Sequence, residues 1–129
     1  MTMHESAEMY LETIYLLTQR GGTVRSVDVA EFMGYSKPSV SRAVGLLKQE
    51  GYLETADGAL VLTPAGRELA AGVFERHTVL TRLLRDMGVS AQTAERDACR
   101  IEHVISEETF EKIKAHLAAT QPEAFGIDN

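Results

Sequence analysis

The stretch from residue 26 to residue 62 constrains the fold more than any other part of the chain. Ser26 can cap a short helix, and Gly34 then supplies a turn. Ser36 can cap a second helix that stops near Gly51, with a proline in its first turn, where amide hydrogens have no intrahelical partner. A short helix, a glycine turn and a second helix are typical of a helix-turn-helix.

The residues that follow predict a β-hairpin. Two short runs, 52–55 and 59–62, flank Asp57-Gly58, which is a strong signal for a tight turn between antiparallel strands. A hairpin directly after a helix-turn-helix is a wing. We therefore predict a winged helix-turn-helix, rather than a small helical domain with an incidental hairpin.

Helices are predicted on both sides of this motif, so the expected fold class is mainly α. The spans are 7–20 before it, then 64 to about 87, 91 to about 104 and 107 to about 119, the last three capped by Thr63, Ser90 and Ser106. We divide the chain into a winged helix-turn-helix domain (1–70), an all-helical domain (71–120) and a flexible tail (121–129). The helical domain carries more apolar surface than so small a unit can bury alone, which favours a homodimer.

The formal net charge of −6 argues against nucleic-acid binding over the whole surface, since phosphates repel a negative surface. Residues 36–49 are the exception, because they include three basic side chains and no acidic one. The chain has one cysteine, no apolar run of about 20 residues and no basic N-terminal flank. We expect a cytoplasmic protein without a membrane span.

The sequence ACRIEHV at 98–104 contains that cysteine, with a glutamate and a histidine three and four positions later. On a helix, Cys99, Glu102 and His103 would share an arc of roughly 100°. A thiolate, a carboxylate oxygen and an imidazole nitrogen are all ligands of divalent metals. The plain alternative is a small apolar cysteine beside a surface Glu–His pair.

Two other predicted helices offer similar donors. His77 lies on the apolar stripe of the long helix, between Val73 and Leu80, where a buried imidazole needs a hydrogen-bond partner or a metal. Met9 and Glu12 form an i,i+3 pair on the first helix. Spacing along the sequence leaves open whether the three helices converge.

The segments AEMYLETIY, RH at 76–77 and DACRIEHVIS resemble the diphtheria toxin repressor family of metal-dependent regulators, with its manganese transport regulator branch. The resemblance runs in order from residue 6 to about residue 120. It implies a homodimer with an N-terminal DNA-binding domain and a helical metal-binding and dimerisation domain. The metal ligands that it implies by position are Met9, Glu12, His77, Cys99, Glu102 and His103.

This set is a hybrid of two patterns. Met9 and Cys99 match the iron-type site, whereas the manganese branch typically has Asp and Glu there. Glu12 and the short chain follow the manganese pattern. Sulfur ligands disfavour Mn(II) relative to Fe(II), Co(II), Ni(II) and Zn(II). We expect Fe(II) as the physiological metal and Mn(II) second, with Co(II), Ni(II) or Zn(II) binding in vitro.

The candidate DNA contacts lie at the start of the second helix of the helix-turn-helix: Ser36, Lys37, Pro38, Ser39, Ser41 and Arg42. The hydroxyls and Lys37 would meet phosphates, and Arg42 would read a base, most simply guanine. Pro38 would touch a thymine methyl or only start the helix. The wing tip lacks a basic residue, so little base reading is expected there.

Together these features predict a metal-dependent transcriptional repressor of metal homeostasis that binds a double-stranded DNA operator. A metal-independent winged-helix regulator or adaptor is the main alternative from another class. A small metalloenzyme is disfavoured, because the sequence has no nucleophile–base motif, no glycine-rich phosphate loop and no H-E-x-x-H. We expect neither catalysis nor an organic small-molecule substrate.

Overall fold

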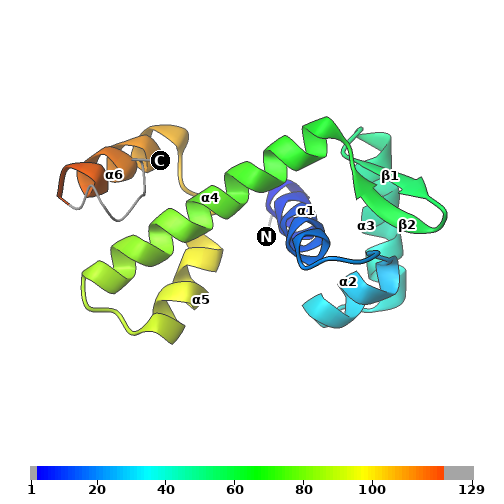
Figure 1. Ribbon diagram of the computed structural model, residues 1–129, viewed down its shortest axis with the longest axis horizontal. Coiled ribbons are helices and arrows are strands. Elements are labelled where there is room, and N and C mark those ends of the chain that lie inside the picture. Colours follow the sequence, from blue (N-terminus) through cyan, green and yellow to red (C-terminus); the bar gives the residue numbers. More distant parts are fainter. Residues whose placement is uncertain (1–2, 121–129) are drawn as a thin grey trace. The chain divides into compact units, whose positions relative to one another are not determined.

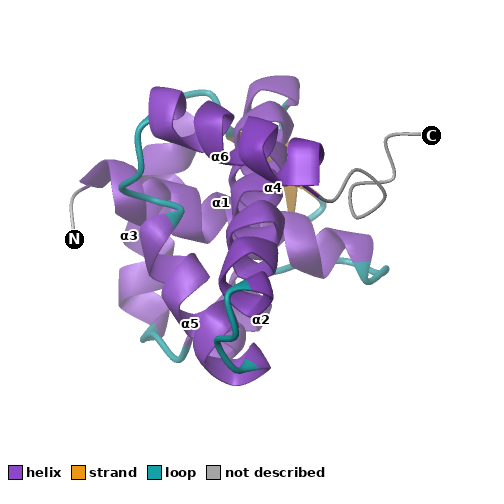
Figure 2. Cartoon of the chain, turned by 90° about the vertical axis from the view of Figure 1, so that its left-hand side faces the viewer, coloured by secondary structure: helices purple, strands orange, loops and turns teal. Residues whose placement is uncertain are grey.

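The computed structural model describes residues 3–120, which contain six helices and one two-stranded sheet (Figure 1). The elements are α1 (Met3–Gln19), α2 (Ser26–Met33), α3 (Lys37–Gln49), β1 (Leu53–Ala56), β2 (Ala59–Leu62), α4 (Pro64–Asp86), α5 (Ala91–Ile101) and α6 (Glu107–Thr120). Helices predominate, which confirms the mainly α prediction (Figure 2). The predicted flexible tail, 121–129, lies outside the described residues.

The chain divides into two compact units, an N-terminal unit (1–74) and a C-terminal unit (75–129), and the division falls inside α4. The predicted boundary near residue 70 stays a prediction. Within residues 3–120, none of the helices combines the length and the hydropathy that a membrane span requires.

The N-terminal unit is built around one core, in which every layer contributes aliphatic side chains. The core residues are Tyr10, Leu11 and Ile14 from α1, Val24 before α2, Val29 and Ala30 from α2, Val40, Val44 and Leu47 from α3, Leu53, Leu60 and Leu62 from the sheet, and Ala70 from α4. The three α3 residues recur at helical spacing, so one face of that helix is buried and the opposite face is exposed. α1 starts at Met3, four residues earlier than predicted.

The helix-turn-helix has one predicted cap and one that the sequence did not suggest. Ser36 caps α3 as predicted, because its Oγ accepts a hydrogen bond from the Ser39 N–H at 3.3 Å. Ser26, predicted to cap α2, is instead its first helical residue. The cap position is Arg25, whose main-chain N–H donates to Asp28 Oδ2 at 2.9 Å. A carboxylate at the third helical position thus binds the cap amide, as in a capping box.

The wing consists of two antiparallel strands of four residues each. Leu53 is paired with Leu62, and both side chains are buried. Asp57 and Gly58 have φ values of +53° and +79°. Two successive residues in the left-handed region are the requirement of a type I′ turn, which suits the twist of a tight hairpin. The Asp-Gly signal in the sequence is therefore confirmed.

Main-chain hydrogen bonds attach the wing to the rest of the N-terminal unit. The Leu60 N–H donates to the Val24 carbonyl at 2.8 Å, so the segment before α2 covers the edge of β2. At the other end, the Thr63 N–H donates to the Tyr52 carbonyl at 3.0 Å. The Thr63 hydroxyl accepts from the Gly66 N–H at 3.1 Å and so caps α4, as predicted.

The C-terminal unit packs α5 and α6 with the second part of α4. Ser90 and Ser106 accept hydrogen bonds from Thr93 N and Thr109 N at 3.4 and 3.1 Å, so both predicted caps are confirmed. α5 ends at Ile101, about three residues before its predicted end. A small core joins α4 to α6 and contains Val79, Phe110 and Leu117, with Leu83, Ile105 and Ile113 around it.

The apolar stripe predicted along α4 is only partly buried. Val73 and Leu80 are buried. Met87, the first residue after the end of α4 at Asp86, is 70% exposed. Val104, after α5, is 66% exposed. Met87 and Val104 therefore leave apolar surface on the C-terminal unit.

Lys114 on α6 is paired with α4. Its Nζ lies 2.9 Å from Glu75 Oε2 and 5.5 Å from the centroid of the Phe110 ring. The hydrogen bond from Lys114 to Glu75 is the main reason that the pKa of Lys114 is raised above its usual 10.5, although burial acts in the opposite direction. A raised lysine pKa in the folded state stabilises the fold below the unfolded value and stops doing so as the pH rises through the folded value.

We expect Lys114→Met to lower the free energy of unfolding by less than about 1 kcal/mol at neutral pH, because the ion pair is partly exposed. The difference between wild type and variant should shrink as the pH rises from about 10.5 through the higher pKa of the folded state, where the folded wild-type lysine loses its charge. Urea unfolding of both proteins at a series of pH values measures this difference. A difference that stays constant to high pH would show that only the alkyl chain of Lys114 contributes.

Candidate functional site

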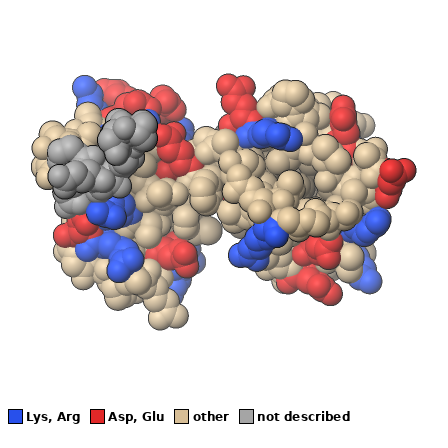
Figure 3. All heavy atoms as spheres, in the orientation of Figure 1, with Lys and Arg blue, Asp and Glu red and all other residues tan. Residues whose placement is uncertain are grey.

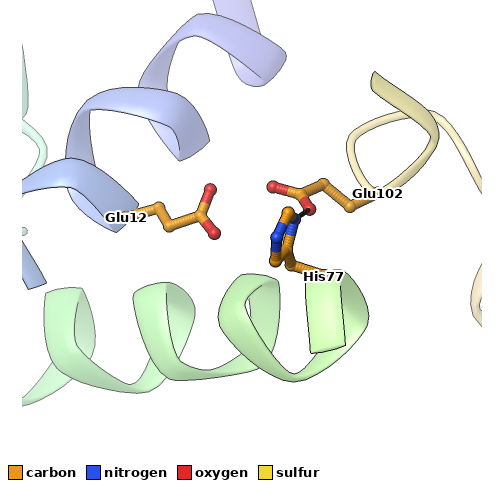
Figure 4. A group of neighbouring side chains, drawn as sticks. All are labelled: Glu12, His77 and Glu102. Carbon is orange, nitrogen blue, oxygen red and sulfur yellow. Dashed lines mark hydrogen bonds and ion pairs between the residues drawn. The ribbon is translucent and has the colours of Figure 1, made fainter. Parts of the chain in front are cut away.

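A fully buried carboxylate marks the end of α5. Glu102, the residue that caps this helix, has a side chain with no exposed surface. Its Oε1 lies 2.8 Å from His77 Nδ1 on α4, the contact dashed in Figure 4, and its Oε2 lies 3.3 Å from His103 Nε2. An ionised carboxylate only accepts hydrogen bonds, so His77 donates when Glu102 carries its charge. A buried carboxyl group with an imidazole nitrogen beside each oxygen is common at functional sites.

The residues present fit a divalent metal ion. Two ligands of one first-row ion, each with a bond of about 2.1 Å, lie about 3 Å apart in an octahedral arrangement. His77 Nδ1 and Glu102 Oε1 meet this condition at 2.8 Å. Imidazole nitrogen and carboxylate oxygen together suit Fe(II), Mn(II), Co(II), Ni(II) and Zn(II). The donor types and this distance are therefore compatible with any of these ions.

The predicted Cys99–Glu102–His103 arc spans the C-terminal end of α5, where Glu102 keeps helical dihedral angles. α5 ends at Ile101, so Glu102 and His103 lie at and beyond the helix end. Glu102 and His103 are buried, whereas Cys99, within the helix, is exposed. The predicted helix end near residue 104 was about three residues too late.

Met9 and Glu12 belong to the N-terminal unit. Met9 is half-buried and Glu12 is buried, and both lie on α1. Within the C-terminal unit the structure brings together His77, Glu102 and His103. The metal-binding roles of Met9, Glu12 and Cys99 stay predictions.

The predicted DNA-binding residues are at the start of α3. Lys37, Pro38, Ser41 and Arg42 are exposed, as is Ser36, while Ser39 is half-buried. The Ser36 hydroxyl donates to Ser39 Oγ at 2.9 Å, so these two hydroxyls also serve the cap. The main-chain amides of the first turn have no helical acceptors and point out of the helix start, where phosphates commonly bind.

Arg25 is a basic residue that the sequence did not assign to the wing. A Cβ placed on Gly58 would lie 2.7 Å from Arg25 Nη1, so the guanidinium lies against the wing turn. A basic side chain from another segment is therefore present beside the wing tip, which has none of its own, and the expectation of little base reading there stays a prediction. The two residues are far apart along the chain, and the Leu60–Val24 hydrogen bond that brings their segments together leaves no pattern in the sequence.

Figure 3 shows how charged side chains are distributed on one face of the molecule. On the face drawn in Figure 3, basic and acidic side chains lie among one another. Arg42 nevertheless has a local effect: burial chiefly raises the pKa of Tyr10, Tyr35 raises it further, and the positive charge of Arg42 lowers it. The Arg42 charge thus acts next to the core tyrosine on α1.

Two family models match the chain. The model described as "Iron dependent repressor, N-terminal DNA binding domain" matches residues 2–58, and the one described as "Iron dependent repressor, metal binding and dimerisation domain" matches residues 63–123. Both matches agree with the order of units in the structure. They also support the resemblance seen in the sequence.

Individual relatives give the same result. The chain is 36% identical over 124 residues to the diphtheria toxin repressor of Corynebacterium diphtheriae, covering 95% of this chain and 55% of that protein. It is 38% identical over 110 residues to the transcriptional regulator MntR of Geobacillus kaustophilus, covering 84% and 77%. The solved manganese regulator SloR matches with a TM-score of 0.77 at 28% identity, covering 91% and 54%. The chain spans about half the length of the diphtheria toxin repressors that it matches.

Proposed function

Since this chain belongs to the iron-dependent repressor family, we propose that it is a transcriptional repressor of metal homeostasis whose binding to a double-stranded DNA operator requires a divalent metal. The observation that carries this proposal is the buried Glu102 carboxylate, with imidazole nitrogens of His77 and His103 at 2.8 and 3.3 Å. A winged helix-turn-helix precedes this site in the chain. Metal sensing and DNA binding thus each have a structural counterpart.

We propose six metal ligands, three of which lie together in the C-terminal unit and three of which rest on the sequence and the resemblance. His77, Glu102 and His103 supply nitrogen and oxygen donors in the C-terminal unit. Glu12 and Met9 on α1 would supply a carboxylate and a thioether from the N-terminal unit, and Cys99 a thiolate. The exposure of Cys99 makes this ligand open to oxidation as well as to metal.

Fe(II) is the metal that we favour, and Mn(II) is second. Thioether and thiolate donors favour Fe(II) over Mn(II), and the matching family models are described as iron-dependent. Glu12 and the similarity to MntR and SloR support Mn(II). Co(II), Ni(II) and Zn(II) would bind the same donors in vitro.

The ligands link metal binding to DNA binding through α1. A bound divalent cation supplies positive charge that offsets the carboxylates of Glu12 and Glu102. Glu12 stands next to Leu11, which is fully buried in the core of the N-terminal unit, so a restraint on Glu12 restrains the whole DNA-binding unit. In a homodimer, two restrained α3 helices would match successive major grooves, about 34 Å apart.

The dimerisation domain of the family supports a homodimer as the binding species. Met87 and Val104 provide exposed apolar surface on the C-terminal unit, and self-association would cover such surface. In the proposed complex, Arg42 reads a base, Lys37 and the start of α3 contact phosphates, and Arg25 adds a phosphate contact beside the wing.

We expect Arg42→Ala to weaken operator binding by about 1–3 kcal/mol, the usual discrimination of a bidentate arginine–guanine contact. Binding to unrelated DNA should change much less, so the specificity ratio falls. Lys37→Ala is the matched control: it should weaken binding to all sequences and lower the salt slope by about one. Fluorescence anisotropy at several salt concentrations measures both. Equal losses on operator and unrelated DNA would show that Arg42 contacts only phosphate.

The decisive experiment is an anaerobic anisotropy titration of the protein onto DNA from its own promoter region. It is run at fixed salt with chelator, Fe(II), Mn(II) and Zn(II) in turn, because phosphate-driven affinity depends on salt. Binding that requires metal supports the proposal, and the order of Fe(II) and Mn(II) identifies the sensed metal. By reciprocity, operator DNA should tighten metal binding by the same factor. Equal binding in chelator would instead support a metal-independent winged-helix regulator.

A further inference from the structure

The side chain of Arg76 connects three segments of the C-terminal unit. It lies on α4, directly before His77, and is 20% exposed. Its Nη1 donates to the main-chain oxygens of Glu102 and Ile105 at 3.2 and 3.3 Å. Its Nη2 donates to Glu107 Oε1 at 3.1 Å. One guanidinium therefore joins the end of α5, the turn after it and the first residue of α6.

The contacts of Arg76 with the two carbonyl oxygens indicate a role at the site more directly than its ion pair with Glu107 does. The last carbonyls of a helix have no partner within it, and a positive charge there complements the helix dipole. Each terminal guanidinium nitrogen carries two N–H groups, so Nη1 can donate to both carbonyl oxygens while Nη2 donates to Glu107. Arg76 thus binds the main chain at two points, Glu102 and Ile105, on either side of His103.

Two consecutive residues of α4 bind the two ends of Glu102. Arg76 binds its main-chain oxygen, and His77 Nδ1 binds its carboxylate at 2.8 Å. The contact with His77 involves atoms that are themselves metal ligands in the proposed function. The contact with Arg76 is to the main-chain oxygen, which is not among the proposed metal ligands.

We propose that Arg76 is a positioning residue, which holds the main chain at Glu102 so that its carboxylate faces the metal ligands. This inference rests on the proposed function, and it adds a residue that acts through Glu102 rather than on the metal. Outer partners of metal ligands commonly contribute about 10–100-fold to metal affinity.

The competing explanation is that Arg76 only attaches α6 to α4. Its guanidinium lies 5.6 Å from the centroid of the Phe110 ring, and it is paired with Glu107. Lys114 is a natural control, because it also lies over Phe110 and is paired across the same two helices with Glu75. No described contact joins Lys114 to Glu102. Glu107→Gln is a second control, since it removes the ion pair and keeps the carbonyl contacts.

The test compares Arg76→Met, Arg76→Lys, Glu107→Gln and Lys114→Met in the full chain without DNA. Mn(II) affinity is measured from the electron paramagnetic resonance signal of free Mn(II), after circular dichroism has shown that each variant is folded. We expect Arg76→Met to weaken Mn(II) binding by about 10–100-fold and Arg76→Lys to recover part of the loss. Glu107→Gln and Lys114→Met should stay within about twofold of wild type, since they alter no partner of a metal ligand.

A second readout needs no metal. Long-range proton–nitrogen spectra at one fixed pH report the His77 ring nitrogens, assigned by comparison with His77→Gln. Arg76→Met should shift these signals, because Glu102 is no longer held opposite the ring, and Lys114→Met should not. The inference is wrong if Arg76→Met leaves the signals unchanged, or if Lys114→Met weakens Mn(II) binding equally.

The two readouts separate this inference from the proposed function. A wild-type protein that binds neither Mn(II) nor Fe(II) would overturn the function, whereas the His77 signals would still decide whether Arg76 positions Glu102. Normal Mn(II) binding by both Arg76 variants, with metal-dependent DNA binding intact, would overturn the inference alone.

Discussion

Replacing Glu102 by glutamine is expected to abolish metal-dependent DNA binding while the protein stays folded. Glutamine has nearly the same shape and keeps an oxygen that can accept from His77, which lies 2.8 Å from the carboxylate. It lacks the charge and the second acceptor oxygen that a divalent ion requires. Because outer-shell partners alone contribute about 10–100-fold, loss of this inner ligand should weaken metal binding by more than about 100-fold.

Three measurements check this expectation: Fe(II) and Mn(II) affinity, operator binding with saturating metal, and thermal unfolding with and without metal. Wild type should gain stability from metal, since a ligand that binds only the folded state raises its unfolding temperature. The variant should lose this gain but keep its unfolding temperature in chelator, because a buried neutral amide costs less than a buried charge. Glu108→Gln, an exposed change in the first turn of α6, is the control. Normal metal affinity in Glu102→Gln would remove Glu102 from the ligand set.

Gly66→Ala is expected to destabilise the N-terminal unit by about 3 kcal/mol, at the upper end of the usual cost of overpacking. A Cβ at Gly66 would lie 2.1 Å from the main-chain oxygen of Tyr52 and 3.3 Å from Leu62 Cδ2. The oxygen belongs to the main chain at the start of the wing, so it cannot turn away as a side-chain end would. The higher helix propensity of alanine offsets only about 1 kcal/mol of this cost.

Gly72→Ala provides the matched control on the same helix, because nothing lies within 4 Å of a Cβ at Gly72. This change should be neutral or stabilise the protein by up to about 1 kcal/mol. Urea unfolding of both variants, followed by circular dichroism, gives the comparison. If Gly66→Ala were as stable as Gly72→Ala, the close approach of α4 to Tyr52 would not constrain the fold.

The sequence predicted those features that local chemistry determines. Ser36, Thr63, Ser90 and Ser106 are caps in the structure, because a hydroxyl before an amphipathic run satisfies amides within the same turn. Asp57-Gly58 is the hairpin turn, because few other pairs tolerate two positive φ values. The family resemblance supplied His77 and Glu102 as partners in one site, which spacing alone left open.

Other features were missed or predicted wrongly. The cap position of α2 is Arg25, whose main-chain N–H donates to the Asp28 carboxylate. The sequence favoured Ser26 as the cap, because serine is a common cap residue and arginine is not. α5 ends at Ile101, although no glycine or proline follows in residues 102–105 to mark that end in the sequence. The contacts of Arg76 with two carbonyls join segments from different helices, and no local pattern predicts them.

The division between the two units falls within a continuous helix, and this determines how the protein can be cut. A protease needs an extended, accessible stretch of main chain, whereas residues near Phe74 and Glu75 belong to the regular hydrogen-bond ladder of α4. Nicking should instead occur in exposed turns such as Gly21-Gly22 and Asp57-Gly58. Limited digestion will therefore not release the two units as separate fragments. A fragment designed for study of the DNA-binding unit alone should keep α4 through Asp86 rather than end at the unit boundary.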